Sequence, residues 1–488
     1  MNALFSAEPL LYPSLSPATL GGIRILYGLL LLATLAALLP HARRYFLSER
    51  WGGYGQRHAA VDAVQNPVVM PVLLAAWFAA AVALVTGRGV VVAALVNVIL
   101  CRYFFIQMRW RGVLRGMGAP GFITYWLGAA VLLLEATRRF APESQGLALL
   151  VLQVDFAFIM LSAGLYKFRA GYRQNEGMEL GMVNPEWGYW SRFWSQVSPR
   201  SWWFRIFNQT AWGTEVVAGA LMVVPATRFA GGMLILASFI FIATQIRLGF
   251  LCEMVMVCCL LFAYPGSVVD GWLAAVVPVA FAPSTPAPAP LRTLLAIVLW
   301  GYLLILPFAR AGLAYNFYRK KALPGASQRL LEAYTNFWGL IIWRVFSVDI
   351  TNFFIQIYEQ GSEGSRRLLS SWGRGLRFRQ VAESITVTSL FTTLKYYPGQ
   401  PELFRERLLR YARTLASAPG SLLVFSYLRV GKQPERFVFA PVAEYVVDVA
   451  RGSVTERVLD PSFSVHAPAS TSPIHEGARP GTYAPARP

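Results

Sequence analysis

The sequence predicts an all-α, multi-pass membrane helical bundle of about nine spans, followed by a small soluble α+β domain. Of the 488 residues, 56% are hydrophobic and only 14% are charged, and the mean hydropathy is +0.46, which is outside the range of soluble globular domains. Long apolar runs recur through the first 310 residues. From about residue 377 these runs give way to shorter segments in which the spacing of apolar residues changes, and this change predicts a folded unit outside the membrane.

A membrane-spanning helix needs about 20 mostly apolar residues. The stretch 268–281 is also apolar, but it is short and contains Asp270 and Pro278, so we expect it to be a surface or re-entrant segment. We place the transmembrane bundle at residues 15–310. The apolar runs predict spans near 20–39, 68–86, 89–107, 120–137, 147–168, 207–225, 229–247, 249–265 and 291–310.

Basic residues are concentrated after the first, third and fifth expected spans. The positive-inside rule then places these loops and the C-terminal region in the cytoplasm, with the N-terminus outside. The same topology, together with contact with anionic membrane lipid, accounts for the net charge of +19, and no nucleic-acid-binding motif accompanies the charge. We therefore expect a multi-pass protein of the cell membrane, of the bacterial inner-membrane type, with lipid rather than nucleic acid as a partner.

The loop at 169–206, between the fifth and sixth expected spans, is rich in tryptophan. Trp prefers the membrane interface, where its ring is buried and its N–H stays hydrated, so one interpretation is a loop lying along the membrane. The other is an aromatic wall at the entrance for an amphipathic ligand such as a quinone or lipid. The residues concerned are Trp187, Trp190, Trp194, Trp202 and Trp203.

After the last span, the aromatic and polar pattern from Leu330 to Tyr358 predicts interfacial amphipathic helices within 311–376. The soluble α+β domain is expected at 377–460, and a disordered tail, rich in Pro, Ala and Ser, at 461–488. Within the domain, Glu402–Ala416 has the period of an Arg-rich helix. Alternation predicts strands at Glu383–Phe391, Ser421–Val430, Phe437–Ala440, Glu444–Val449 and Val454–Leu459.

Charged and strongly polar residues within spans are costly and are functional candidates by default. For each acid among them the alternative is an internal salt bridge, for example between Arg102 and either Asp155 or Glu253. The sequence does not decide the pairing. The candidates are Arg102, Asp155, Lys167, Glu215, Gln245, Arg247 and Glu253.

Lys167 is the only lysine in the first 300 residues, in a chain with 44 basic residues. An Arg stays protonated wherever it lies, whereas a Lys at the edge of a low-dielectric region can lose its proton and act as a base. The alternative is a snorkelling lysine, with its stem in lipid and its ammonium in water. A catalytic role and an anchoring role therefore lead to different predictions for the Lys167 side chain.

Several other chemistries lack the residues they require. All four histidines lie in expected loops or the tail, so neither a histidine metal centre nor a Ser/His/Asp triad can form inside the bundle. The four cysteines fall in apolar stretches without a CxxC motif, and phosphate-binding glycine motifs are missing. We expect no metal site, and the residues alone assign no cofactor. What remains is acid–base chemistry by Lys and carboxylates on an apolar or amphipathic substrate.

Three segments carry a resemblance to a known family: Leu20–Leu31 at the first span, Ser162–Phe168 at the end of the fifth, and Trp212–Thr214 at the sixth. In order and spacing they resemble the horizontally transferred transmembrane (HTTM) domain family, over roughly residues 15–310. That family includes vitamin K-dependent gamma-carboxylase. The chain departs from the family at Tyr172, where a Trp is common, and at Gln245, where a His is common.

The resemblance implies a role for Lys167 as the base that deprotonates a reduced quinone, a vitamin K-type hydroquinone. In the family, oxygenation of the quinol then yields a stronger base, which removes the gamma proton of a peptide Glu before carbon dioxide adds. The resemblance thus implies a lyase of the carboxylase and epoxidase type that acts on a quinol or another lipid-soluble substrate.

Two functions follow as hypotheses. In the first, Lys167 is a base, with Asp155 or Glu215 as the supporting acid. Asp155 lies twelve residues before Lys167, about 18 Å along a helix, so it cannot touch Lys167 from the same helix. Glu215, near the start of the sixth span, is therefore the first candidate partner. In the second hypothesis the chain is a non-catalytic integral membrane protein whose basic C-terminal domain binds a partner or anionic lipid.

Overall fold

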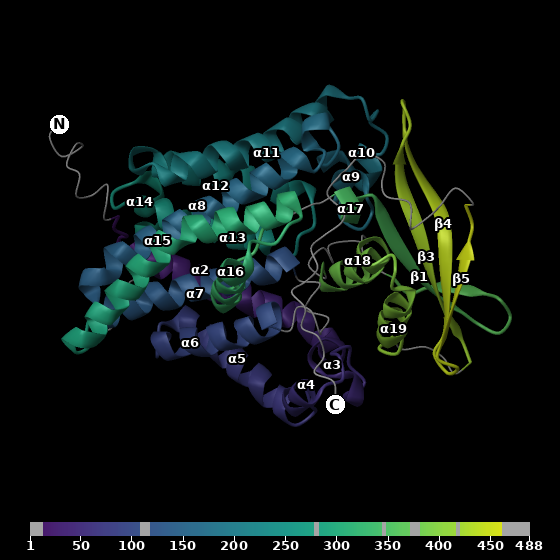
Figure 1. Ribbon diagram of the computed structural model, residues 1–488, viewed down its shortest axis with the longest axis horizontal. Helices are drawn as coiled ribbons and strands as arrows, with labels where there is room; N and C mark the ends of the chain where they lie inside the picture. Colours follow the sequence, from purple (N-terminus) through teal and green to yellow (C-terminus); the bar gives the residue numbers. More distant parts are fainter. Residues whose placement is uncertain are drawn as a thin grey trace.

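The computed structural model describes residues 13–107, 118–277, 283–343, 348–370, 381–415 and 420–460. Helices form an elongated bundle, and a sheet lies at one end of it (Figure 1). Within these described residues, seven helical segments are long and apolar enough to cross a membrane, which agrees with a multi-pass membrane protein. They are Pro17–Phe46, Val69–Thr86, Val90–Gln107, Pro120–Phe140, Pro142–Arg169, Pro225–Gln245 and Ala289–Arg319.

The two other expected spans are helices of a different character. Helix α11 (Trp202–Val223) has 22 residues but carries Asn208, Gln209 and Glu215 in its first two thirds. The segment Leu251–Phe262, which comprises α13 (Leu251–Cys259) and η10 (Leu260–Phe262), is apolar but shorter than 18 residues. A count of nine spans therefore stays a prediction.

The long helices of the bundle follow one another back and forth, as expected for consecutive spans (Figure 1). The turn between α7 and α8 lies beside the start of α15, where Thr285 N donates to Arg139 O at 2.8 Å. The opposite end of α8 leads into the junction with the sheet domain. The bounds are α2 (Pro17–Leu38), α5 (Val69–Thr86), α6 (Val90–Cys101), α7 (Gly118–Phe140), α8 (Gln145–Arg169), α12 (Arg228–Gln245) and α15 (Ala289–Arg319).

Short helices connect the long ones. The apolar stretch expected to be a surface or re-entrant segment contains α14, whose Val268 is 88% exposed. Asp270 ties α14 to the start of α2 by accepting a hydrogen bond from Thr19 Oγ1 at 2.8 Å. The short helices include α3 (Ala42–Phe46), α4 (Ala59–Val64), η4 (Arg102–Gln107), η8 (Tyr172–Gln174), α9 (Met178–Val183), α10 (Ser191–Trp194), α14 (Val268–Val276), α16 (Gly325–Trp338) and α17 (Val348–Thr351).

Helices α8 and α11 approach each other closely through glycine. A Cβ on Gly164 would lie 2.7 Å from Val216 Cγ2 and 2.9 Å from the Trp212 carbonyl oxygen. A Cβ on Gly219 would lie 2.9 Å from the Leu161 backbone nitrogen. Small residues of this kind let two membrane helices pack backbone to backbone. The contact fixes which residues of α8 and α11 face each other.

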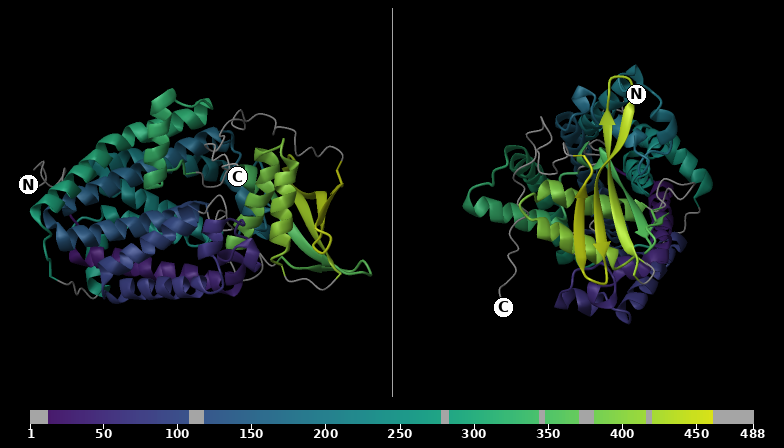
Figure 2. Two further views of the ribbon diagram at one scale, coloured as in Figure 1. Left: turned by 60° about the horizontal axis from the view of Figure 1, so that its bottom comes forward. Right: turned by 90° about the vertical axis from the view of Figure 1, so that its right-hand side faces the viewer.

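The C-terminal domain is a five-stranded antiparallel sheet in the order β2-β1-β3-β4-β5. Helices α18 (Val381–Tyr396) and α19 (Pro401–Ala412) lie between the sheet and the bundle (Figure 2). The domain core is largely aromatic, with Phe391 of α18 against Phe404 of α19 and Tyr445 of β4. The strands are β1 (Phe353–Gln360), β2 (Arg366–Leu368), β3 (Leu422–Lys432), β4 (Phe437–Asp448) and β5 (Ser453–Val458).

Two elements differ from the sequence prediction. Glu383–Phe391 was expected to be a strand but lies in helix α18. The strand was predicted because Ser and Thr alternate there with apolar residues. In a helix, however, a Thr hydroxyl can donate to a backbone carbonyl one turn back, as Thr392 does to Ser389. Phe353–Gln360, within the expected interfacial helices, is strand β1, paired on both sides. The helix at 401–412 and the strands at 422–432 and 453–458 are confirmed.

The two strands expected at Phe437–Ala440 and Glu444–Val449 are one strand, β4, because the chain continues to pair with β3 through the bulge at Tyr427 and Leu428. The tail 461–488 lies outside the described residues.

We expect Gly164→Ala to lower the apparent melting temperature of the detergent-purified protein. The added Cβ pushes α8 away from α11, and overpacking of this kind costs about 1–3 kcal/mol. Gly213→Ala is the matched control, since a Cβ at Gly213 in α11 meets nothing within 4 Å. Equal melting temperatures for the two variants would show that the glycine contact does not set the α8–α11 spacing.

Candidate functional site

The structure brings Lys167 and Glu215 together. Lys167 Nζ lies 2.6 Å from Glu215 Oε1, and the two side chains are 2% and 1% exposed. Glu215 Oε2 has no hydrogen-bond partner in the part of the chain that the structure describes. The snorkelling interpretation of Lys167 is therefore wrong, because its ammonium group is inside the bundle and paired with an acid from another helix.

The local fold explains the pairing. Lys167 lies three residues after Gly164, so the close approach of α8 and α11 places it one helical turn beyond the glycine, on the side that faces Glu215. The chain leaves α8 after Arg169 and turns through Gly171, at φ 109°, a left-handed conformation that suits glycine. This turn brings the Tyr172 ring to 6.0 Å from Lys167 Nζ.

Burial of a Lys–Glu pair lowers the cost of moving the proton from the lysine to the glutamate. In a low-dielectric interior the ammonium–carboxylate form loses hydration that it would have in water, which narrows the energy gap to the neutral amine and carboxylic acid. Transfer over the 2.6 Å contact converts one form into the other. Such a transfer would leave the net charge of the pair unchanged.

Asp155, the other acid considered as support for Lys167, belongs to a separate cluster. It accepts hydrogen bonds from Arg310 (2.6 Å), Tyr302 (2.9 Å) and Trp126 (2.8 Å). This arrangement satisfies both carboxylate oxygens and ties α8 to α15 and α7. Asp155 is therefore a structural ion-pair partner of Arg310, and Arg102 is not its partner.

The remaining polar span residues also have local roles. Arg102 donates to Phe337 O at 2.5 Å and to Tyr125 Oη at 3.2 Å, so the salt bridge considered from the sequence does not form. Gln245 accepts a hydrogen bond from Trp194 Nε1 at 3.2 Å. Arg247 donates to Pro185 O at 2.9 Å. The contacts of Gln245 and Arg247 hold the Trp-rich loop against the bundle.

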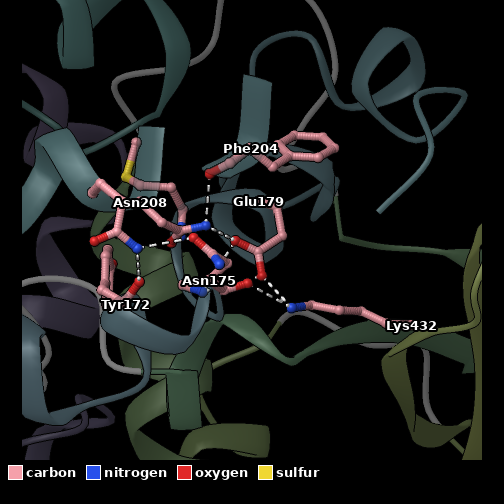
Figure 3. A network of polar contacts seen from close by, with 9 residues as sticks. Tyr172, Asn175, Glu179, Phe204, Asn208 and Lys432 are labelled. Carbon is pink, nitrogen blue, oxygen red and sulfur yellow. Dashed lines mark hydrogen bonds and ion pairs between the residues drawn. The ribbon is translucent and has the colours of Figure 1, made fainter. Parts of the chain in front are cut away.

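Sequence reasoning missed a second Lys–Glu pair, in which the acid is buried and the lysine is partly exposed. Glu179, in α9, is 0% exposed and accepts hydrogen bonds from Gly177 N (3.1 Å) and Asn208 Nδ2 (2.6 Å). Lys432, at the end of β3, forms an ion pair with the same carboxylate. Figure 3 shows Glu179 held between Asn208 and Lys432. No apolar run or motif surrounds Glu179 or Lys432 in the sequence, so only the tertiary structure reveals their contact.

Glu186, also missed, lies where the bundle meets the soluble domain. It is 1% exposed; its Oε1 accepts a hydrogen bond from Thr388 of α18 at 3.2 Å, and Oε2 has no partner among the described residues. Burial raises the pKa of this carboxyl to about 8, against smaller opposing effects of Thr388, Ser384 and the Ile355 backbone N–H. Glu186 is therefore mostly protonated at neutral pH.

The tryptophans of the loop divide into two groups. Trp190, Trp202 and Trp203 are 58%, 56% and 46% exposed, and the rings of Trp202 and Trp203 stack with centroids 3.9 Å apart. Trp187 is buried. The exposed group favours the membrane-interface interpretation, because these rings face outward instead of converging on a shared ligand site.

Other site types find little support in the described ranges. There, no group of three or more His, Cys, Asp or Glu residues could hold a metal ion. A pocket of about 680 Å³ on the soluble domain is lined by α19 and the β4–β5 turn, and its lining includes neither Lys167 nor Glu215. The four cysteines are buried and free, as expected for small apolar side chains.

The fold therefore defines a class: a multi-pass membrane protein with a buried Lys–Glu pair and a soluble α+β domain against one end of the bundle. Comparison with known proteins adds nothing more specific, since no family model, no curated protein and no solved structure matches the chain.

We expect Glu186→Gln to stabilise the protein increasingly as the pH rises. The folded carboxyl has a pKa of about 8, above the unfolded value of about 4.3. The folded state thus binds the proton more tightly than the unfolded state does. The proton's contribution to the free energy of unfolding is fully present below the unfolded pKa and is lost as the pH rises through the folded pKa. Between the two pKa values, the free energy of unfolding of the wild type should fall, relative to that of the Gln variant, by up to about 1.4 kcal/mol per pH unit.

The measurement is the apparent melting temperature in detergent from about pH 5 to about pH 9. Glu402→Gln, at a side chain that is 78% exposed, serves as the control and should follow the wild type. A constant difference between Glu186→Gln and the wild type across this range would contradict a buried, protonated Glu186.

Proposed function

We propose that this protein is a membrane enzyme that uses Lys167 as a base, with Glu215 as its partner, on a lipid-soluble acid. The observation that carries the proposal is the buried 2.6 Å contact between the only lysine of the first 300 residues and an acid on a neighbouring helix. The resemblance to the HTTM family, which includes vitamin K-dependent gamma-carboxylase, supports the same residue as the base.

The chemistry begins with proton transfer inside the pair. With its proton on Glu215, Lys167 is a neutral amine and can take a proton from a substrate hydroxyl; the O–H electron pair stays on the substrate oxygen. Lys167 then becomes an ammonium group beside a protonated Glu215. Arg could not fill this role, because a guanidinium keeps its proton at neutral pH.

The substrate class follows from the surroundings. The pair lies among apolar helices, so a substrate that arrives through lipid and carries one weakly acidic hydroxyl fits best. A quinol, such as a vitamin K-type hydroquinone, has both properties. With Lys167 only 2% exposed, neighbouring side chains must move when such a substrate binds. Carboxylase and epoxidase-like chemistry is the finer proposal that the family resemblance adds.

A second candidate function has an observation in its favour. A closed pair with both side chains almost completely buried is also what a purely structural salt bridge between α8 and α11 would be. In that case the protein is a non-catalytic integral membrane protein, and its basic C-terminal domain binds a partner or anionic lipid.

We expect Lys167→Arg to abolish activity while the protein still inserts and folds. Arg can keep the ion pair with Glu215 but is larger than Lys, so overpacking at this buried site should lower the free energy of unfolding by about 1–3 kcal/mol. Catalysis should fall to the level of Lys167→Ala. The measurement is quinol consumption and epoxide formation by reconstituted protein in vesicles, followed by mass spectrometry.

Lys321→Arg, the same change at an exposed lysine, is the control and should retain full activity. Wild-type turnover in Lys167→Arg would remove the catalytic role and leave a structural lysine. A wild type inactive on every quinol tested would favour the second candidate function.

A further inference from the structure

The segment that leads into α11 presents a row of apolar side chains to the outside of the bundle. It comprises α10, the turn after it and the start of α11, at the end of the bundle that faces the sheet (Figure 1). The rings of Trp202 and Trp203 stack on each other, with centroids 3.9 Å apart. The exposed apolar residues of the segment are Trp190, Phe193, Trp202, Trp203 and Ile206.

The exposure of these side chains is built into the local fold. Trp190 Nε1 donates to Thr244 O at 2.9 Å, and so ties the segment to the last turn of α12. Trp194 Nε1 donates to Gln245 Oε1 at 3.2 Å in the same turn. The Trp194 ring also packs on Phe204 of α11, with centroids 5.6 Å apart. One side of the segment is thus fixed to the bundle, and the other side faces outward.

The apolar surface continues along α12, which belongs to a candidate membrane span. Phe207 of α11 packs against Phe241 of α12, with ring centroids 5.3 Å apart. Ile240 and Phe241 are exposed, so in a membrane they face lipid. Trp is enriched where the hydrocarbon meets water. The stacked rings of Trp202 and Trp203 therefore mark the level at which this lipid-facing surface ends.

Three arginines are interleaved with the apolar residues of the segment. Arg192 lies in α10, Arg200 in the turn before α11, and Arg205 near the start of α11. All three are exposed, and within the described ranges none of them forms an ion pair with an acid. The chain therefore leaves three positive charges here without a partner. These arginines and the five exposed apolar residues form what we call the Trp–Arg surface.

The soluble domain adds positive charge beside this surface. Its β3–β4 hairpin reaches the segment, where Ser198 Oγ donates to Pro434 O at 3.4 Å. The hairpin contains Lys432 and Arg436 but only one acid, Glu435. The partner of the Trp–Arg surface must therefore be anionic, and the continuity of that surface with the lipid-facing side of α12 favours a lipid over a protein.

We propose that the Trp–Arg surface binds anionic phospholipid, with its rings at the depth of the headgroups and its three arginines on the lipid phosphates. A guanidinium can make two parallel hydrogen bonds to one phosphate. Anionic lipid also attracts arginines that lie just outside the hydrocarbon. This inference goes beyond the proposed function and does not depend on Lys167. It assigns lipid binding to a segment of the bundle, whereas the second candidate function assigns it to the soluble domain.

The experiment measures which lipids stay bound to the protein. Full-length protein is reconstituted into vesicles of phosphatidylcholine and phosphatidylglycerol in equal amounts, extracted in mild detergent, and analysed by native mass spectrometry. The wild type should retain mainly phosphatidylglycerol. In the triple variant Arg192→Gln, Arg200→Gln and Arg205→Gln, the ratio of retained phosphatidylglycerol to phosphatidylcholine should fall by about fivefold for each arginine removed.

A second triple variant is the matched control. Arg405→Gln, Arg451→Gln and Arg457→Gln remove the same charge from exposed positions on α19, the β4–β5 turn and β5, and this variant should keep the wild-type lipid ratio. Both triple variants change exposed side chains, so both should keep the wild-type melting temperature in detergent. An equal loss of preference in the two variants, or no loss in the first, would overturn the proposal.

Two other occupants of the surface would give different results. If it is a site for free phosphate, sodium phosphate should release phosphatidylglycerol from the wild type, whereas sodium chloride of the same ionic strength should not. If it joins two copies of the chain, the wild type should have the mass of a dimer, which Trp202→Gln with Trp203→Gln should dissociate at an unchanged lipid ratio. Either result would overturn the assignment to lipid, under which this double variant retains less phosphatidylglycerol and keeps the wild-type mass.

Discussion

The structure depends on one constraint: a charge inside the apolar bundle must be paired, because a lone ion there has lost its hydration. Helix α8 meets this constraint twice, with Asp155 paired to Arg310 of α15 and Lys167 paired to Glu215 of α11. A third pair, Arg24 with Glu135, joins α2 to α7. Apolar packing alone would leave the rotation of each helix weakly defined. These pairs fix which faces of α8 meet α15 and α11.

The same constraint couples the bundle to the soluble domain. Glu179 is buried in the junction, and its cation, Lys432, is on the domain. Asn184 donates to Thr351 O and Phe353 O at 2.9 and 2.8 Å, and Glu186 meets Thr388 of α18. Separation of the domain would leave Glu179 buried without its cation. The domain is therefore an integral part of the molecule, although the sequence pattern suggests an independent module.

The sequence predicted what depends on local pattern. Apolar runs located the membrane helices, and the rarity of lysine singled out Lys167 and, by helix geometry, its contact with Glu215. Partners supplied by distant segments could not be predicted. Arg310 lies 155 residues after Asp155, and Lys432 lies more than 250 residues after Glu179. Strand β1 was mistaken for part of a helix because Phe353–Gln360 has aromatic and polar residues that fit either period, and its pairing with β3 decides between them.

The choice of cation in these pairs separates two groups. Asp155 and Glu135 are paired with Arg310 and Arg24, and both acids join long helices of the bundle. Glu215 and Glu179 are paired with Lys167 and Lys432. Glu215 belongs to α11, and Glu179 accepts a hydrogen bond from Asn208 of the same helix. An arginine would serve equally well, or better, for a fixed ion pair, because its planar group makes two parallel bonds and never loses its charge. A lysine in the same place cannot make two parallel hydrogen bonds to the carboxylate, but it can give up its proton. Among these four pairs, arginine therefore occurs where an ion pair joins long helices, and lysine occurs beside α11. That division is what the proposed base role of Lys167 requires, because a lysine there can release its proton and an arginine cannot.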